Sequence, residues 1–163
     1  MLVLDIQREV EDDLPDDKRL RIVTQETLKW ADGDARGREV SLRLVGRDEM
    51  RGLNARYRGR DYATNVLSFP AEIPDSVDTT LLGDVVICAP VVACEALAQH
   101  KPAAAHWDHM LVHGLLHLLG HDHESDADAE VMENLERQVL AALGWPDPYL
   151  AVAEGAPLAE MSE

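Results

Sequence analysis

The segment HGLLHLLGHDH, from His113 to His123, constrains the fold more than any other part of the chain. It places four of the seven histidines within eleven residues, beside an apolar run. We expect a helix over 103–119, and Gly120 is a natural left-handed stop after it. Because a histidine is costly to bury without a partner, this helix needs either a metal ion or a chain of hydrogen bonds to satisfy its imidazoles.

The spacing H-x3-H-x5-H favours the metal ion. On a helix, His113 and His117 lie one turn apart and face the same way. Gly120 lets the chain turn back so that His123 reaches the same point, although His121 competes for this third position. Three neutral imidazoles suit Zn²⁺ or another divalent first-row metal, and they leave one coordination position open, as in catalytic zinc sites. We therefore expect one ion at the end of a central helix.

The same spacing occurs in metalloproteases of the form H-E-x-x-H-x-x-G-x-x-H, in which the glutamate is the general base. In this chain Gly114 occupies the position of that glutamate. The sequence therefore keeps the metal-binding spacing of these proteases without the residue that moves protons in them.

The rest of the chain predicts an α+β fold with about four strands and about five helices, in one domain over 1–150. The segments that favour strands are 2–7, 39–46, 66–69 and 83–89, with 66–69 near a sheet edge because Pro70 follows it. The segments that favour helices are 15–31 with Pro15 in its first turn, a short helix capped by Asp48, 90–99, 103–119 and 124–143. In the last helix the apolar residues in line are Val131, Leu135, Val139 and Leu143. The remaining residues, 151–163, have few large apolar side chains, so we expect a flexible tail.

Charge is distributed unevenly along the chain. The formal net charge is −16, yet residues 1–60 hold 13 of the 15 lysines and arginines. Five of these arginines fall within fourteen residues: Arg47, Arg51, Arg56, Arg58 and Arg60. This patch can face an anionic substrate, although an acidic protein as a whole repels phosphate groups.

Two further features indicate a cytoplasmic protein that does not contact a membrane. No segment approaches the roughly 18 apolar residues of a membrane span. The two cysteines, Cys88 and Cys94, are too few for a disulfide framework and too far apart for a zinc ribbon, so we expect them to be reduced.

Three blocks, LNARYRGRDYATNVLSFP, LLGDVVICAP and HWDHMLVHGLLHLLGHDHE, resemble the YbeY family of bacterial metal-dependent endoribonucleases. The resemblance covers about residues 40–143. It implies a small mixed β-sheet packed with helices and cleavage of single-stranded RNA. It also implies 3′-end maturation of small-subunit (16S) ribosomal RNA, a part in ribosome quality control, and a partner in the ribosome or in a ribosomal or GTPase protein.

Carried over by residue, the family's zinc ligands fall on His113, His117 and His123, and its functional arginine falls on Arg58. Cleavage of a phosphodiester builds negative charge on the non-bridging oxygens, which a metal ion and a guanidinium stabilise. Arg58 and His113 are therefore the predicted catalytic residues. The activated water is then either the nucleophile or the base that takes the 2′-hydroxyl proton. From the residues alone, a surface ion pair between Arg58 and Asp61 or another acidic residue is the simpler interpretation.

The chain departs from the family pattern at His121, where many members have tyrosine, and at Asn65, where many have aspartate. Neither position is a proposed ligand. His106, His109 and Asp122 are candidates for residues that contact a metal ligand and orient it or relay a proton. Core packing for the two histidines, and helix capping for Asp122, are equally simple interpretations.

Two other kinds of protein stay open as alternatives. One is a different zinc metallohydrolase, either peptidase-like or a phosphoesterase. The other is a ribosome-associated factor whose metal is structural. The missing glutamate disfavours a peptidase, the open coordination position disfavours a structural ion, and the arginine patch favours a phosphate-bearing substrate. For Ser68 we expect a structural hydrogen bond rather than a contact with substrate.

Overall fold

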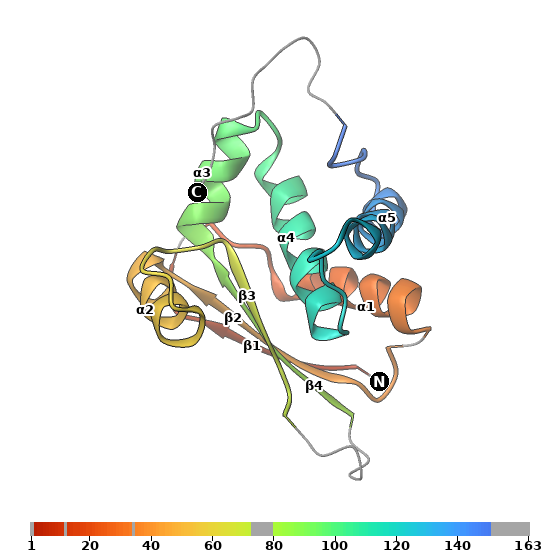
Figure 1. The fold of residues 1–163 in the computed structure, drawn as a ribbon, viewed down its shortest axis with the longest axis horizontal. Coiled ribbons are helices and arrows are strands. Elements are labelled where there is room, and N and C mark those ends of the chain that lie inside the picture. Colours follow the sequence, from red (N-terminus) through yellow and green to blue (C-terminus); the bar gives the residue numbers. More distant parts are fainter. Residues whose placement is uncertain (1, 12, 34, 73–79, 151–163) are drawn as a thin grey trace.

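A four-stranded sheet forms the centre of the computed structural model (Figure 1), which describes residues 2–11, 13–33, 35–72 and 80–150. The strand order is β1 (Val3–Arg8), β2 (Glu39–Val45), β4 (Leu81–Cys88) and β3 (Val66–Pro70). The first three strands are parallel, and β3 pairs antiparallel with β4 at the edge. The sheet is therefore mixed, and the predicted edge position of β3 is confirmed.

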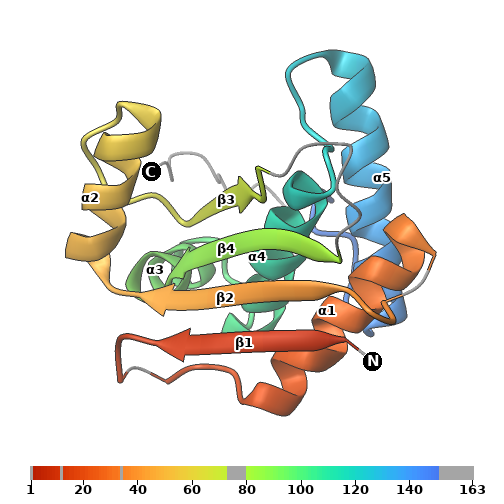
Figure 2. The ribbon, with the colours of Figure 1, turned by 90° about the horizontal axis from the view of Figure 1, so that it is seen from below.

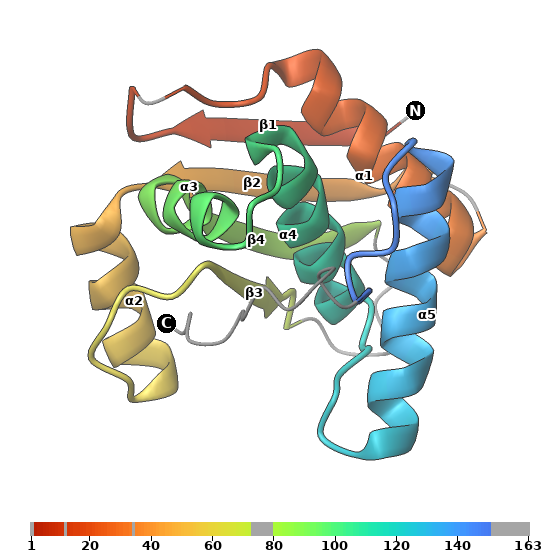
Figure 3. The same ribbon diagram turned by 90° about the horizontal axis from the view of Figure 1, so that it is seen from above.

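The five predicted helices are present in the described residues and cover the sheet unequally. Figures 2 and 3 show α1 (Asp17–Asp32), α3 (Ala89–Ala98), α4 (Ala103–Leu118) and α5 (Asp126–Ala142) gathered on one face. The helix α2 (Arg47–Arg58) stands apart from them, at the end of the sheet near β3. Alternate residues of β4 follow this division: Val85 and Ile87 belong to the main core, whereas Val86 and Cys88 pack in a second cluster with Met50 of α2.

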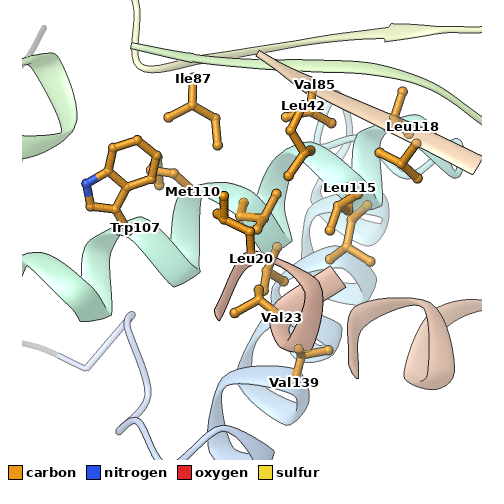
Figure 4. Packing of buried hydrophobic residues seen from close by; sticks show 14 of the residues in the cluster. Leu20, Val23, Leu42, Val85, Ile87, Trp107, Met110, Leu115, Leu118 and Val139 are labelled. Carbon is orange, nitrogen blue, oxygen red and sulfur yellow. The ribbon is translucent and has the colours of Figure 1, made fainter. Parts of the chain in front are cut away.

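The helix α4 lies at the centre of the main core, which explains its apolar sequence. Its side chains meet the sheet on one side and α1 and α5 on the other, as the packing of Val85, Leu115, Val23 and Val139 shows (Figure 4). Leu115 is fully buried, and burial of one such side chain contributes about 1.5–3 kcal/mol. The packing of these apolar side chains holds α4 in place between the sheet and the two helices.

Two predicted helix starts are wrong in detail, and side-chain hydrogen bonding explains one of them. The N-cap of α1 is Asp16, whose carboxylate accepts a hydrogen bond of 2.8 Å from the backbone N–H of Arg19, so Pro15 precedes the helix. Helix α2 begins after Gly46, and Asp48 lies inside its first turn instead of capping it. There the carboxylate still interacts favourably with the helix dipole.

The buried face of α5 is rotated from the predicted one. Val131 is 53% exposed, whereas its neighbour Met132 is fully buried, together with Glu136 and Val139. The helix therefore turns a carboxylate into the core, and this residue bears directly on the site.

The described elements form one domain, as expected, and none of its helices in the described ranges is both long and apolar enough to cross a membrane. The predicted tail, 151–163, lies outside the described residues.

Candidate metal centre and active site

Three histidines meet where α4 ends. His113 and His117 lie on successive turns of α4, and Gly120, with φ of 95°, reverses the chain so that His123 returns to them. One ring nitrogen from each of the three residues lies within 4.8 Å of the other two. Three imidazole donors at this separation fit Zn²⁺ or a similar first-row ion. His121, the competing candidate, does not belong to this group.

The protonation state of His117 also suits metal binding. Burial, reinforced by the proximity of His113 and His123, lowers the pKa of His117 to about 4. This side chain is therefore neutral near pH 7, with a lone pair available for a metal ion.

Arg58, the last residue of α2, faces the same cavity from the other side. Its guanidinium donates a hydrogen bond of 2.8 Å to the carbonyl oxygen of Ser68 and lies over the ring of Phe69, 5.1 Å from the centroid. The cavity has a volume of about 460 Å³, and its lining includes Arg58, Asn65, Asp122 and the three histidines. The structure thus brings the predicted catalytic arginine and the predicted ligands to one place.

The described residues do not form the simpler arrangement, a surface ion pair of Arg58 with Asp61 or another acidic residue. Both carboxylate oxygens of Asp61 instead accept hydrogen bonds from Arg51, at 2.7 and 3.0 Å. Within the part of the chain that the structure describes, no carboxylate lies within ion-pair distance of Arg58. Among these residues, no acidic side chain neutralises its charge, which suits an anionic ligand.

Ser68 fixes the position of Arg58 relative to the histidines. Its hydroxyl donates a hydrogen bond of 2.7 Å to the carbonyl oxygen of Gly114 on α4, while its own carbonyl accepts from Arg58. The structural hydrogen bond expected for Ser68 is thus present. Gly114 permits this close approach, since a Cβ atom there would lie 2.7 Å from Val85 and 3.0 Å from Val66. The protease glutamate has no room at this position.

Glu136 of α5 is the main residue that the sequence did not reveal. It is fully buried, and its Oε2 lies 2.6 Å from Nδ1 of His113 while its Oε1 lies 3.0 Å from Nε2 of His109. Burial alone would raise the pKa of Glu136, but the hydrogen bonds from the two histidines outweigh it and hold the pKa well below the ordinary value. The only signal in the sequence was a glutamate in register with the apolar residues Met132 and Val139.

The three residues that we expected to orient a ligand or relay a proton, His106, His109 and Asp122, occupy different places. His109 is linked to His113 through Glu136, whereas His106 is bound to Glu95 of α3 at 2.7 Å. The carboxylate of Asp122 accepts from the backbone N–H of Glu124, at 3.2 Å, so its recorded contact is local.

Comparison with known proteins identifies the family. The family model described as endoribonuclease YbeY matches residues 5–144, which is most of the chain. The chain belongs to this family. The prediction made from the three sequence blocks is therefore confirmed.

Relatives in three genera agree with this assignment. A protein named endoribonuclease YbeY from Pseudomonas putida (strain W619) is 53% identical over 150 residues, covering 91% of this chain and 94% of the relative. The proteins of the same name from Cellvibrio japonicus and Halorhodospira halophila are 64% and 62% identical over 111 and 117 residues. These matches cover 68% and 70% of this chain, and 63% and 76% of the respective relatives.

A solved structure matches the fold. The solution structure of TM1509 from Thermotoga maritima superposes with a TM-score of 0.56 at 23% sequence identity. The match covers 91% of this chain and all of the other. The α+β architecture is thus shared with an experimentally determined structure.

Proposed function

We propose that this endoribonuclease cleaves single-stranded RNA in the cavity between α2 and the end of α4, using Arg58 and one metal ion, preferably Zn²⁺. One observation carries the proposal: Arg58, which no carboxylate neutralises in the described residues, shares a cavity with His113, His117 and His123. A phosphodiester needs both kinds of group, because charge develops on its oxygens during cleavage.

The three histidines would hold the ion through neutral nitrogens. When bound, such an ion supplies Lewis-acid stabilisation of a phosphate oxygen and makes water a stronger acid near neutral pH. The same three residues leave room for substrate, because an ion with three protein ligands keeps an open position.

Arg58 would bind and orient the scissile phosphate. Of its five N–H groups, one is directed to the carbonyl oxygen of Ser68 and one to that of Tyr57. The remaining N–H groups can donate to two phosphate oxygens at once, which both neutralises and aligns the group. The aromatic ring of Phe69 beneath the guanidinium limits its movement.

The natural substrate that we propose is the 3′ end of small-subunit ribosomal RNA, with a role in ribosome quality control and a cytoplasmic location. The family resemblance supports this proposal. The net charge of −16 opposes unaided binding of RNA. We therefore also propose that the ribosome, or a ribosomal or GTPase protein, presents the RNA to the cavity.

A direct test offers three substrates to the purified protein: single-stranded RNA, duplex RNA and a denatured protein. Each is incubated after treatment with a chelator and again after addition of Zn²⁺. We expect cleavage of single-stranded RNA that the chelator abolishes and zinc restores. Cleavage of the denatured protein alone would overturn the proposal and favour a peptidase. Equal cleavage of the two RNAs would overturn the single-strand preference.

A further inference from the structure

Glu136 is a carboxylate inside the main core. It is fully buried on α5, between the apolar residues Met132 and Val139. Several kcal/mol are lost when an unpaired charge is moved into such surroundings. The buried carboxylate therefore needs hydrogen-bond donors around it, and the identity of these donors indicates its role.

Three donors surround the carboxylate. His113 contacts Oε2 through Nδ1, and His109 contacts Oε1 through Nε2. The hydroxyl of Tyr149 donates to the same Oε1. An ionised carboxylate only accepts hydrogen bonds, so each of the two imidazoles must carry its proton on the nitrogen that faces Glu136.

The bond to His113 has a consequence at the metal centre. With the proton fixed on Nδ1, the lone pair of His113 lies on Nε2, the nitrogen left for a metal ion. A carboxylate hydrogen-bonded to a metal-binding imidazole both orients the ring and makes it a stronger donor. Among the described residues, no carboxylate contacts the imidazole of His117 or His123. The three ligands are therefore not equivalent.

We propose that Glu136 is a positioning residue that sets the tautomer and orientation of His113 for metal binding, and that Tyr149 holds Glu136 in place. The proposal rests on the metal site of the proposed function. It assigns a role at that site to two residues outside the histidine motif.

Tyr149 is itself fixed by a set of contacts in the segment after α5. Its backbone N–H donates to Asp147 at 2.8 Å, and Asp147 is paired with Arg137 of α5 at 3.0 Å. The guanidinium of Arg137 also lies over the ring of Tyr149, 5.3 Å from its centroid. The segment 147–149 is thereby tied to α5 at the level of Glu136, which fits a supporting role at the metal centre.

The decisive experiment measures zinc affinity rather than RNA cleavage. Glu136→Gln keeps the shape of the side chain, but an amide accepts on one atom only and cannot serve both imidazoles. The control is Glu130→Gln, on the exposed surface of the same helix. Affinity is measured by competition with a chromophoric chelator, and the coordination geometry by the visible absorption of the Co²⁺-substituted protein.

We expect E136Q to bind Zn²⁺ about 10- to 100-fold more weakly than the wild type, with an altered Co²⁺ spectrum, and E130Q to match the wild type. A residue that only stabilised the fold would lower the unfolding temperature of the metal-free protein and leave both readouts unchanged. Wild-type affinity in a folded E136Q protein would overturn the inference.

A second variant keeps the inference testable if E136Q does not fold. Tyr149→Phe removes one hydroxyl at the edge of the core, and Tyr62→Phe on the loop before β3 is its control. We expect a several-fold loss of zinc affinity in Y149F alone, and equal affinities in the two variants would contradict the role of Tyr149. If the wild type bound no divalent metal, the proposed function would fail as well. A wild type that binds zinc tightly, with unaffected variants, would overturn only the inference.

Discussion

Arg58 is the residue whose contribution to cleavage can be separated most cleanly from folding and metal binding. It is an exposed residue at the end of α2 and is not a ligand. Arg58→Ala should leave zinc content unchanged and lower the rate of RNA cleavage about 100-fold, the usual effect of removing one group that stabilises transition-state charge. The control is Arg51→Ala, which breaks only the exposed pair with Asp61. Unchanged cleavage by R58A would contradict the role proposed for Arg58.

A substitution at Gly114 tests whether the packing of α4 against the sheet requires a glycine at this position of the histidine motif. In Gly114→Ala the new Cβ would lie 2.7 Å from Val85, so α4 or the sheet must shift. We expect the free energy of unfolding in urea to fall by about 1–3 kcal/mol. Gly52→Ala is a matched control, since Gly52 lies within α2 with no atom near its missing Cβ, and it should stabilise the protein by about 0.5–1 kcal/mol. Stabilisation by both changes would show that α4 does not pack this closely.

For individual residues, the sequence was sufficient to predict that His113, His117 and His123 lie close together. It was insufficient to predict which residue contacts and orients His113. His113, His117 and His123 are close in the chain, so helix geometry and one glycine bring them together. Glu136 reaches His113 from another helix. That contact depends on how two helices are packed, which periodicity does not specify.

The helices, too, were predictable in position but not in how they pack. Periodicity located α5 but placed its inward face on Val131, which is half exposed, while the neighbouring Met132 is buried. Both faces contain apolar residues at helical spacing, and only the tertiary partners α1 and α4 choose between them. The strand β3 was predicted at an edge because Pro70 cannot donate to a ladder. The order of the other three strands in the sheet could not be predicted from the sequence and is known from the structure.

The contact between Glu95 of α3 and His106 of α4 should affect how the stability of the protein depends on acidic pH. Burial would raise the pKa of Glu95, but hydrogen bonds from His106 and Asn65 outweigh it and leave the pKa below its ordinary value of 4.5. The ionised carboxylate therefore stabilises the folded state above the unfolded pKa. This stabilisation is lost as the pH falls through the lower pKa of the folded state.

Glu95→Gln removes this titration. The variant should be less stable than the wild type at pH 7, and its free energy of unfolding should fall less steeply between about pH 5 and pH 3. Urea unfolding followed by circular dichroism across this range provides the measurement. Equal slopes for the two proteins would show that the α3–α4 pair does not contribute.

For the molecule as a whole, the central question is whether the metal ion is needed for folding or only for chemistry. The main core is formed by apolar side chains of the sheet and of α1, α3, α4 and α5, whereas His113 and His117 are half-buried and His123 is exposed. A small zinc-dependent fold, by contrast, unfolds when the ion is removed. The ligands here lie at one end of a helix that packing already holds.

We therefore expect the chelated protein to keep its helical circular dichroism and a single cooperative unfolding transition. Zinc at 100 times its dissociation constant should add about 2.7 kcal/mol through binding to the folded state alone. For a domain of this size that corresponds to a rise in Tm of about 5–10 °C. Calorimetry with chelator and with excess zinc measures both states. Loss of the transition on chelation would mean that the ion is structural, and would favour a ribosome-associated factor over an enzyme whose folded site exists before the metal binds.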